Sequence, residues 1–220
     1  MSYPGARISP VPLLTTALLP VPLAPEISLY LADAQVGLFD LTGGEFRSDE
    51  PPPFWAFVWA GGQALARYVL DHPAEVRGRT VLDVAAGSGV AAIAAARAGA
   101  AEVTAIDLDR NAAAAIRRNA AANDVAVTAT VLDVTDSPLT DVLLAGDVFY
   151  SPTVAELMAG VLRDRARRGA RILVGDPGRG YFPERMLIQV AEYVVPVPAA
   201  LEETETLITG VYEIRATGGG

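Results

Sequence analysis

A glycine-rich turn near the middle of the chain has the residue types and spacing that bind nucleotide-like ligands. Gly87-Ser88-Gly89 follows an apolar stretch and precedes an alanine-rich one, which predicts a strand, a tight turn and a helix. Glycine lets the backbone turn sharply and lets a ligand approach the amino end of the helix without an intervening side chain. Asp107 lies about 20 residues beyond Gly87, the spacing at which an acidic side chain can bind ribose hydroxyls.

Asp83, shortly before the first glycine, indicates the charge of the cofactor. A dinucleotide would place its anionic pyrophosphate over the glycine turn, where the carboxylate of Asp83 would repel it. S-adenosylmethionine (SAM) instead carries a cationic ammonium and a cationic sulfonium, which a carboxylate attracts. The glycine pattern alone would suit NAD, but Asp83 favours SAM.

The elements that must position these residues alternate regularly between strand and helix. We expect strands over 80–85, 102–107, 126–132, 141–145 and 171–175, and helices over 61–70, 89–97, 109–123 and 152–168. Such alternation is typical of βαβ units with right-handed crossovers. A helix is then expected over 183–189, and an antiparallel hairpin over 191–198 and 206–214. The predicted fold class is α/β: a doubly wound, mostly parallel, seven-stranded Rossmann-like sheet with a C-terminal antiparallel hairpin.

The first part of the chain differs in character from the rest. Residues 1–50 are interrupted by proline and weakly periodic, with one or two short strands expected over 26–32 and 36–40. We predict an N-terminal extension over 1–50 that packs on one domain over 51–220. The uncharged run 8–25 contains five prolines, which would break a membrane helix or a signal-peptide core. We therefore expect no membrane partner.

Composition excludes several kinds of chemistry. The 220 residues contain no Cys, which rules out disulfides, Cys-ligated zinc, iron–sulfur clusters and thiol nucleophiles. The single His, His72, cannot supply a multi-His metal site, so no metal is expected. The formal charge of −9 provides no general basic field for a phosphate backbone, which argues against nucleic acid as a partner. We expect a cytoplasmic protein.

The segment Val81-Leu82-Asp83-Val84-Ala85-Ala86-Gly87-Ser88-Gly89 resembles the first motif of class I (seven-β-strand) SAM-dependent methyltransferases, with Ala85 where that family usually has glycine. The resemblance implies that Asp83, Ala85, Gly87 and Gly89 contact SAM. It also implies that Asp107-Leu108, at the end of the second core strand, binds the ribose, and that Asp133, at the end of the third, meets the adenine amino group. The implied product is S-adenosylhomocysteine (SAH).

Three further segments, 53–65, 146–150 and 175–179, resemble a narrower group, the electron transfer flavoprotein β-subunit lysine methyltransferases, whose bacterial members are often labelled nicotinamide N-methyltransferase-like. The seven-β-strand lysine methyltransferases carry D/E-x-x-Y/F after the fourth strand, and Asp147 and Tyr150 match that motif. The resemblance implies that these two residues are catalytic, that Asp147 also lies against SAM, and that the Trp59 indole contacts the cofactor.

The residue types at Asp147 and Tyr150 are consistent with an amine as the acceptor of the methyl group. A partly desolvated Asp147 carboxylate could hold a lysine ammonium and align its nitrogen with the methyl group. The alternative structural roles are helix capping before Pro152 for Asp147 and core packing for Tyr150. N-P-P-Y and D-P-P-Y are absent after the fourth strand, which disfavours methylation of bases and of glutamine.

The leading function is lysine N-methylation of the electron transfer flavoprotein β-subunit or a similar cytosolic protein. One alternative is a small-molecule N-methyltransferase that acts on a pyridine or an amine; another is a catalytically silent SAM-binding module. An open rim around Asp147 would favour the protein substrate, and a lid formed by 1–50 would favour the small molecule. Absence of turnover with SAM bound would favour the silent module.

Overall fold

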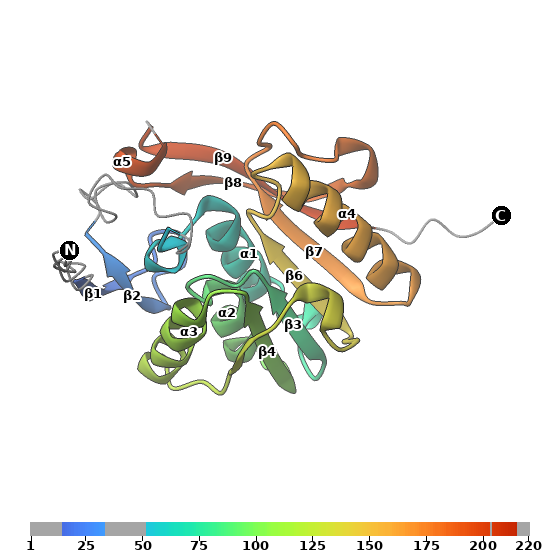
Figure 1. The fold of residues 1–220 in the computed structure, drawn as a ribbon. Coiled ribbons are helices and arrows are strands. Elements are labelled where there is room, and N and C mark those ends of the chain that lie inside the picture. The colour runs from blue at the N-terminus through green and yellow to red at the C-terminus, as the bar shows by residue number, and fades with distance from the viewer. Residues whose placement is uncertain (1–14, 34–51, 203, 215–220) are drawn as a thin grey trace, which may run out of the picture.

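A seven-stranded sheet organises the protein (Figure 1). The computed structural model describes residues 15–33, 52–202 and 204–214. The strands of the sheet are β3 (Thr80–Val84), β4 (Glu102–Asp107), β5 (Thr128–Val131), β6 (Val142–Gly146), β7 (Arg171–Asp176), β8 (Ile188–Pro196) and β9 (Thr206–Ile214). Their order is β5-β4-β3-β6-β7-β9-β8. The first five run parallel, and β9 runs antiparallel to both β7 and β8. The predicted fold class, including the closing hairpin, is confirmed.

The central strands are mostly apolar because both faces of the sheet are covered. Leu82 of β3, Leu144 of β6 and Leu173 of β7 are completely buried. β3 lies between β4 and β6, so the chain leaves β3 toward one edge of the sheet and later returns toward the other. In open α/β sheets, ligands bind at the carboxyl ends of the strands at such a switch point.

Two separate hydrophobic clusters cover the two faces of the sheet. The helices are α1 (Ala60–Asp71), α2 (Val90–Arg97), α3 (Arg110–Ala122), α4 (Pro152–Arg167) and the short α5 (Ala199–Glu202). Buried side chains of α1, α2 and α3 belong to one cluster. Met158 and Leu162 of α4 belong to the other, with Leu143 and Ile172 of the sheet. Figure 1 shows α4 on the opposite side of the sheet from α1 and α2.

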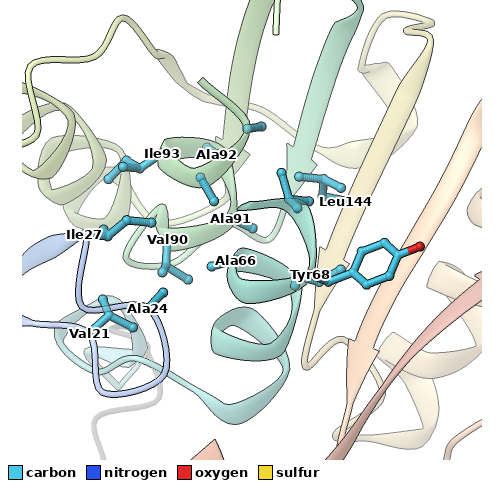
Figure 2. Close-up of a cluster of buried hydrophobic side chains, with 14 of the residues drawn as sticks. Val21, Ala24, Ile27, Ala66, Tyr68, Val90, Ala91, Ala92, Ile93 and Leu144 are labelled. Atoms are coloured by element: carbon cyan, nitrogen blue, oxygen red, sulfur yellow. The ribbon is translucent and has the colours of Figure 1, made fainter. Parts of the chain in front are cut away.

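The described N-terminal residues form a small sheet of their own. β1 (Thr16–Pro20) pairs antiparallel with β2 (Ser28–Ala32), which corresponds to the strand expected over 26–32, whereas β1 was not predicted. The connecting loop buries Val21, Ala24 and Ile27, and Figure 2 shows them beside Val90 of α2. The strand expected over 36–40 lies outside the described residues. The division into an extension over 1–50 and a domain over 51–220 stays a prediction.

The prediction of a helix over 183–189 is wrong. The chain forms only a 3-10 turn over Glu184–Met186, and β8 begins at Ile188. Ile188 and Gln189 pair with Glu213 and Tyr212 of β9, so tertiary pairing decides the conformation of a segment with weak local preference. Within the described ranges, no helix is both long enough and apolar enough to span a membrane.

Candidate active site

A pocket opens where the carboxyl ends of β3 and β6 meet the amino ends of α1 and α2. Its lining residues are Trp59, Gly62, Asp83, Ala85, Ala86, Gly87, Ser88, Val90, Ala91, Gly146 and Asp147. Five of these, Trp59, Asp83, Ala85, Gly87 and Asp147, are site residues that the sequence predicts. The predicted residues Gly89, Asp107, Leu108, Asp133 and Tyr150 lie outside the lining, whereas Gly62, Ser88 and Gly146 line it without having been predicted.

The glycine turn has the backbone conformation that its sequence requires. Gly87 has φ 51° and Gly89 has φ 81°, both in the left-handed region that glycine adopts without strain. Gly89 precedes the first residue of α2, and a Cβ there would lie 3.1 Å from the Ile116 side chain of α3. Ala85 also has a positive φ, 50°, which explains why glycine is usual at this position of the motif. The turn leaves room beside the amino end of α2 for a cofactor.

Asp107 links the glycine turn to the end of β4. One carboxylate oxygen, Oδ2, accepts a hydrogen bond from the Gly87 N–H at 2.9 Å, and the other, Oδ1, accepts one from the Asp109 N–H at 3.0 Å. Burial raises the pKa of Asp107, and these two N–H groups oppose that rise. Each carboxylate oxygen can accept a second donor. Asp107 can therefore accept hydrogen bonds from two ribose hydroxyls, which fits the adenosyl part of SAM.

Asp83 is a buried carboxylate that lines the pocket. It is 2% exposed, and its Oδ2 accepts a hydrogen bond from the Ala92 N–H in the first turn of α2 at 3.0 Å. Burial raises the pKa of Asp83 to about 7, with a smaller contribution from the negative charge of Asp107. A buried carboxylate such as Asp83, with the partly buried carboxylate of Asp107 nearby, is unfavourable when ionised unless a cation balances it. The pocket therefore fits a ligand with a positive charge, such as the ammonium of SAM.

Asp147 contacts three elements at once. Its N–H donates to the Gly175 carbonyl of β7 at 2.9 Å, and its Oδ2 accepts from the Gly62 N–H of α1 at 3.0 Å. Among the described residues, its Oδ1 is buried without a hydrogen-bond partner, and Nη2 of Arg179 lies 3.9 Å from it. Burial raises the pKa of Asp147 to about 7, and the charge of Asp176 adds to the rise, while the Gly62 N–H and Arg179 oppose it.

Capping of the next helix does not explain Asp147. The hydroxyl of Ser151 caps α4 by accepting from the Val154 N–H at 3.4 Å. Asp147 instead accepts from the first turn of α1, which has no side-chain cap of its own at Trp59. This contact depends on close packing, because a Cβ on Gly61 would lie 2.1 Å from the Gly175 carbonyl oxygen. One oxygen of Asp147 thus has a structural contact and the other is free for a ligand.

Three aromatic side chains, Trp59, Phe54 and Tyr150, form a group that reaches the pocket through Trp59. The Trp59 indole N–H donates to the Phe54 carbonyl at 3.0 Å, and the Phe54 ring lies 5.9 Å from the Trp59 ring and 6.3 Å from the Tyr150 ring. Tyr150 is 55% exposed. Its pKa is raised by burial of the hydroxyl and by the charge of Asp107. Leu108, which is 72% exposed, contributes apolar surface beyond the end of β4.

Asp133 lies after β5, where an adenine contact was predicted. Its Oδ1 accepts hydrogen bonds from the N–H and the hydroxyl of Thr135, both at 2.8 Å, and these contacts lower the pKa of Asp133. The hydrogen bonds cap the 3-10 turn over Val134–Asp136 and leave Oδ2 free. The adenine contact stays a prediction. In the part of the chain that the structure describes, no cluster of three or more His, Asp or Glu side chains could hold a metal ion.

The known proteins that this chain resembles in sequence are methyltransferases. Residues 64–175 match the family model for ribosomal protein L11 methyltransferase (PrmA). The chain is 38% identical over 172 residues to the electron transfer flavoprotein beta subunit lysine methyltransferase of Mus musculus, covering 74% of this chain and 67% of that protein. It is 40% identical over 182 residues to the Danio rerio protein of the same name, covering 79% and 70%.

Solved structures agree on the fold. Magnesium protoporphyrin IX methyltransferase from Synechocystis PCC 6803 with bound SAH is similar, with a TM-score of 0.52 and 15% identity, covering 70% of this chain and 82% of that chain. A Thermoplasma acidophilum protein has a TM-score of 0.56 and 19% identity, covering 71% and 91%. At these identities the likeness concerns the arrangement of strands and helices alone.

Proposed function

Because this chain belongs to the family of the electron transfer flavoprotein β-subunit lysine methyltransferases, within the class I SAM-dependent methyltransferases, we propose that it methylates a lysine side chain of that β-subunit or of a similar protein. The observation that carries the proposal is the Asp147 carboxylate. It lines the same pocket as the glycine turn, and its Oδ1 is buried without a hydrogen-bond donor. An amine that enters the pocket beside the cofactor supplies the missing donor.

The cofactor is SAM, which when bound supplies a methyl carbon made electrophilic by the positively charged sulfur. We assign the ribose hydroxyls to Asp107 and the positive charge of the cofactor to Asp83, because the first has free acceptor capacity and the second lacks a countercharge. Gly87 and Ala85 form the part of the turn that faces the cofactor, since both line the pocket. Trp59, which precedes α1 and lines the same pocket, would pack its indole against the bound cofactor.

Asp147 has two tasks in this proposal. As a carboxylate it attracts the incoming lysine ammonium and fixes the position of its nitrogen through Oδ1. The nitrogen must then lose a proton before its lone pair can form the new C–N bond as the C–S bond breaks and SAH is released. A carboxyl whose pKa lies at about 7 can accept that proton near neutral pH, or pass it to water. Orientation and exclusion of water supply the rest of the rate enhancement.

Exposed aromatic side chains close to Trp59 support a large substrate over an enclosed small molecule. Phe54 is 40% exposed and Tyr150 is 55% exposed, so aromatic surface is available to pack along the methylene stem of a lysine. Tyr181, in the connection between β7 and β8, is 50% exposed. A lid formed by residues 1–50 would have favoured a small molecule, but most of that segment lies outside the described residues.

We also propose that the protein works in the cytoplasm without binding nucleic acid or membranes. The absence of Cys and the acidic charge of −9 support this assignment.

The test of the proposal is methyl transfer by the Asp147→Asn variant. We expect the rate to fall by about 100-fold or more, because a positioning and electrostatic group is lost, while SAH affinity stays within about 1 kcal/mol of the wild type. Asp164→Asn on α4 is the matched control, since its carboxylate is 40% exposed and pairs with Arg168 at the surface. Full activity of the Asp147 variant would remove that residue from the mechanism.

A further inference from the structure

Asp176 is a buried carboxylate that the mechanism above does not use. It ends β7 and has no exposed surface. Its Oδ1 accepts hydrogen bonds from the N–H groups of Gly178 at 2.7 Å and Arg179 at 3.1 Å, but its Oδ2 is buried with no donor in the part of the chain that the structure describes. Burial raises the pKa of Asp176, and the two N–H groups and the Arg179 guanidinium oppose that rise. A buried anionic oxygen without a partner is costly, which points to a ligand that supplies one.

Asp176 lies beside Asp147 by virtue of strand register. β6 and β7 are parallel, and Gly146 is paired with Gly175, so the next residue of each strand is an aspartate. The Asp147 N–H also donates to the carbonyl of Gly175, which fixes the two strand ends to each other. The charge of Asp176 raises the pKa of Asp147, as expected for carboxylates that are near neighbours. Two adjacent carboxylates thus each present one oxygen that has no hydrogen-bond donor.

Arg179 lies near the carboxylates of Asp147 and Asp176, but it forms its hydrogen bonds with the carboxylate of Glu202. Its Nη1 and Nη2 donate to the two carboxylate oxygens of Glu202, at 3.1 Å and 2.5 Å. Glu202 is the last residue of α5, at the end of the β8–β9 hairpin (Figure 1). The same Nη2 remains 3.9 Å from the Asp147 Oδ1, too far for a hydrogen bond. Glu202 therefore holds the guanidinium close enough to oppose the rise in the pKa of both aspartates, but not close enough to donate a hydrogen bond to Oδ1 of Asp147.

From this geometry we infer that Asp147 and Asp176 together form a paired-carboxylate site for the substrate ammonium, and that Arg179 stands in for that ammonium in the free protein. The inference rests on the proposed function and specifies the substrate class as a primary or methylated alkylammonium rather than a neutral pyridine. An ammonium has several N–H donors on one compact centre, which can satisfy Oδ1 of Asp147 and Oδ2 of Asp176 at once. Arg179 stays bound to Glu202 when the ammonium enters and takes over its electrostatic role, and Asp176 positions the ammonium.

The first measurement uses n-butylammonium as a probe of the site in the SAH complex, with n-butanol as its uncharged counterpart. We expect n-butylammonium to bind and n-butanol to bind at least about tenfold more weakly, because only the cation gains charge-assisted hydrogen bonds. In Asp176→Asn, n-butylammonium should bind about tenfold more weakly, and the KM for a lysine substrate should rise more than kcat falls. SAH affinity should stay within about twofold of the wild type. Unchanged n-butylammonium affinity and KM in Asp176→Asn would overturn the inference.

Substitutions of Arg179 and of its partner Glu202 should change the affinity for n-butylammonium in opposite directions. Arg179→Met removes the competing cation and keeps most of its length, so n-butylammonium should bind about threefold to tenfold more tightly. Glu202→Gln weakens the hold on Arg179, which can then settle on Asp147, so the probe should bind more weakly. In the double variant the Glu202 substitution should have no further effect, because the cation that it releases is absent. Arg185→Met, in the 3-10 turn over Glu184–Met186, is the matched control and should bind the probe like the wild type.

The outcomes separate this inference from the proposed function. Weaker probe binding in Arg179→Met, with SAH binding and thermal unfolding unchanged, would show that Arg179 supports the site rather than competes for it, even if the wild type methylates lysine. Turnover of neutral pyridines with no methylation of protein lysine would instead contradict the proposed function itself.

Discussion

Replacing Asp147 with asparagine should stabilise the free protein while it removes methyl transfer. The side chain of Asp147 is 12% exposed, and burial raises its pKa from 3.8 to about 7. Each pH unit by which a pKa is raised corresponds to about 1.4 kcal/mol of preference for the neutral form. The ionised carboxylate therefore destabilises the fold by up to about 4 kcal/mol above pH 7. Asparagine can still accept the Gly62 N–H and tolerates the positive φ of 54° at this position.

The pH dependence identifies the cause of this stabilisation. In the unfolded chain Asp147 ionises near pH 3.8, and in the folded protein it ionises near pH 7. Between these values the folded state binds a proton that the unfolded state has lost, so the stability of the wild type falls as pH rises from about 4 to about 7. The variant lacks this effect. Its gain over the wild type should be about 2–4 kcal/mol at pH 8 and smaller by about 2 kcal/mol at pH 5.

Urea unfolding of the wild type and the variant at pH 8 and pH 5, without cofactor, measures the difference directly, because groups that titrate alike in both proteins cancel. Asp164→Asn is the control, and its exposed carboxylate should change stability by less than about 1 kcal/mol at either pH. The reasoning would be refuted if Asp147→Asn lost stability equally at both pH values. That result would mean that the charge of Asp147 is needed to hold the first turn of α1.

Three further substitutions, with Gly160→Ala as a control, test the cofactor side of the pocket and the packing that builds it. Asp107→Ala should weaken SAH binding by about 1–3 kcal/mol in calorimetry, through loss of charge-assisted hydrogen bonds, and unchanged affinity would contradict the ribose assignment. Ala85→Gly should stabilise the protein by about 0.5–1 kcal/mol in urea unfolding, because alanine is strained at φ 50°; a loss would show that its methyl group is needed. Gly61→Ala should destabilise by more than about 2 kcal/mol, since the Cβ would meet the Gly175 carbonyl. Gly160→Ala in α4, which has open space around it, should instead stabilise slightly, and similar effects at the two positions would refute the packing argument.

Sequence patterns predicted the parts of the fold that depend on local signals. The apolar runs that became β3, β6 and β7 needed no knowledge of their neighbours, because strands buried on both faces are mostly apolar. The segment 183–189 has no such signal, and its conformation is decided by pairing with β9. β1 was missed for the same reason, since its residues are mostly exposed and it forms a strand by pairing with β2.

Some residues of the site could likewise be predicted from local sequence, whereas others depend on contacts between distant parts of the chain. Asp83 and Asp107 could be identified because their distance from the glycine turn is fixed within consecutive elements. The hydrogen bond between Asp147 and Gly62 joins residues 85 positions apart, so no local pattern reveals it. The Arg179–Glu202 pair likewise depends on where the β8–β9 hairpin folds back. The segment 175–179 could be singled out from the sequence by its resemblance to the lysine methyltransferase group, but the burial of Asp176 within it could not be predicted.

The most direct test of the account is methylation of the purified electron transfer flavoprotein β-subunit from the same organism. The folded β-subunit is incubated with the enzyme and labelled SAM, and the label is located by mass spectrometry of its peptides, with nicotinamide as a parallel acceptor. The account predicts methyl groups on lysine of the β-subunit, no turnover of nicotinamide at a comparable rate, and loss of transfer in Asp147→Asn with SAH still bound. Methylation of nicotinamide instead of lysine, or no transfer to any acceptor while SAM is bound, would contradict it.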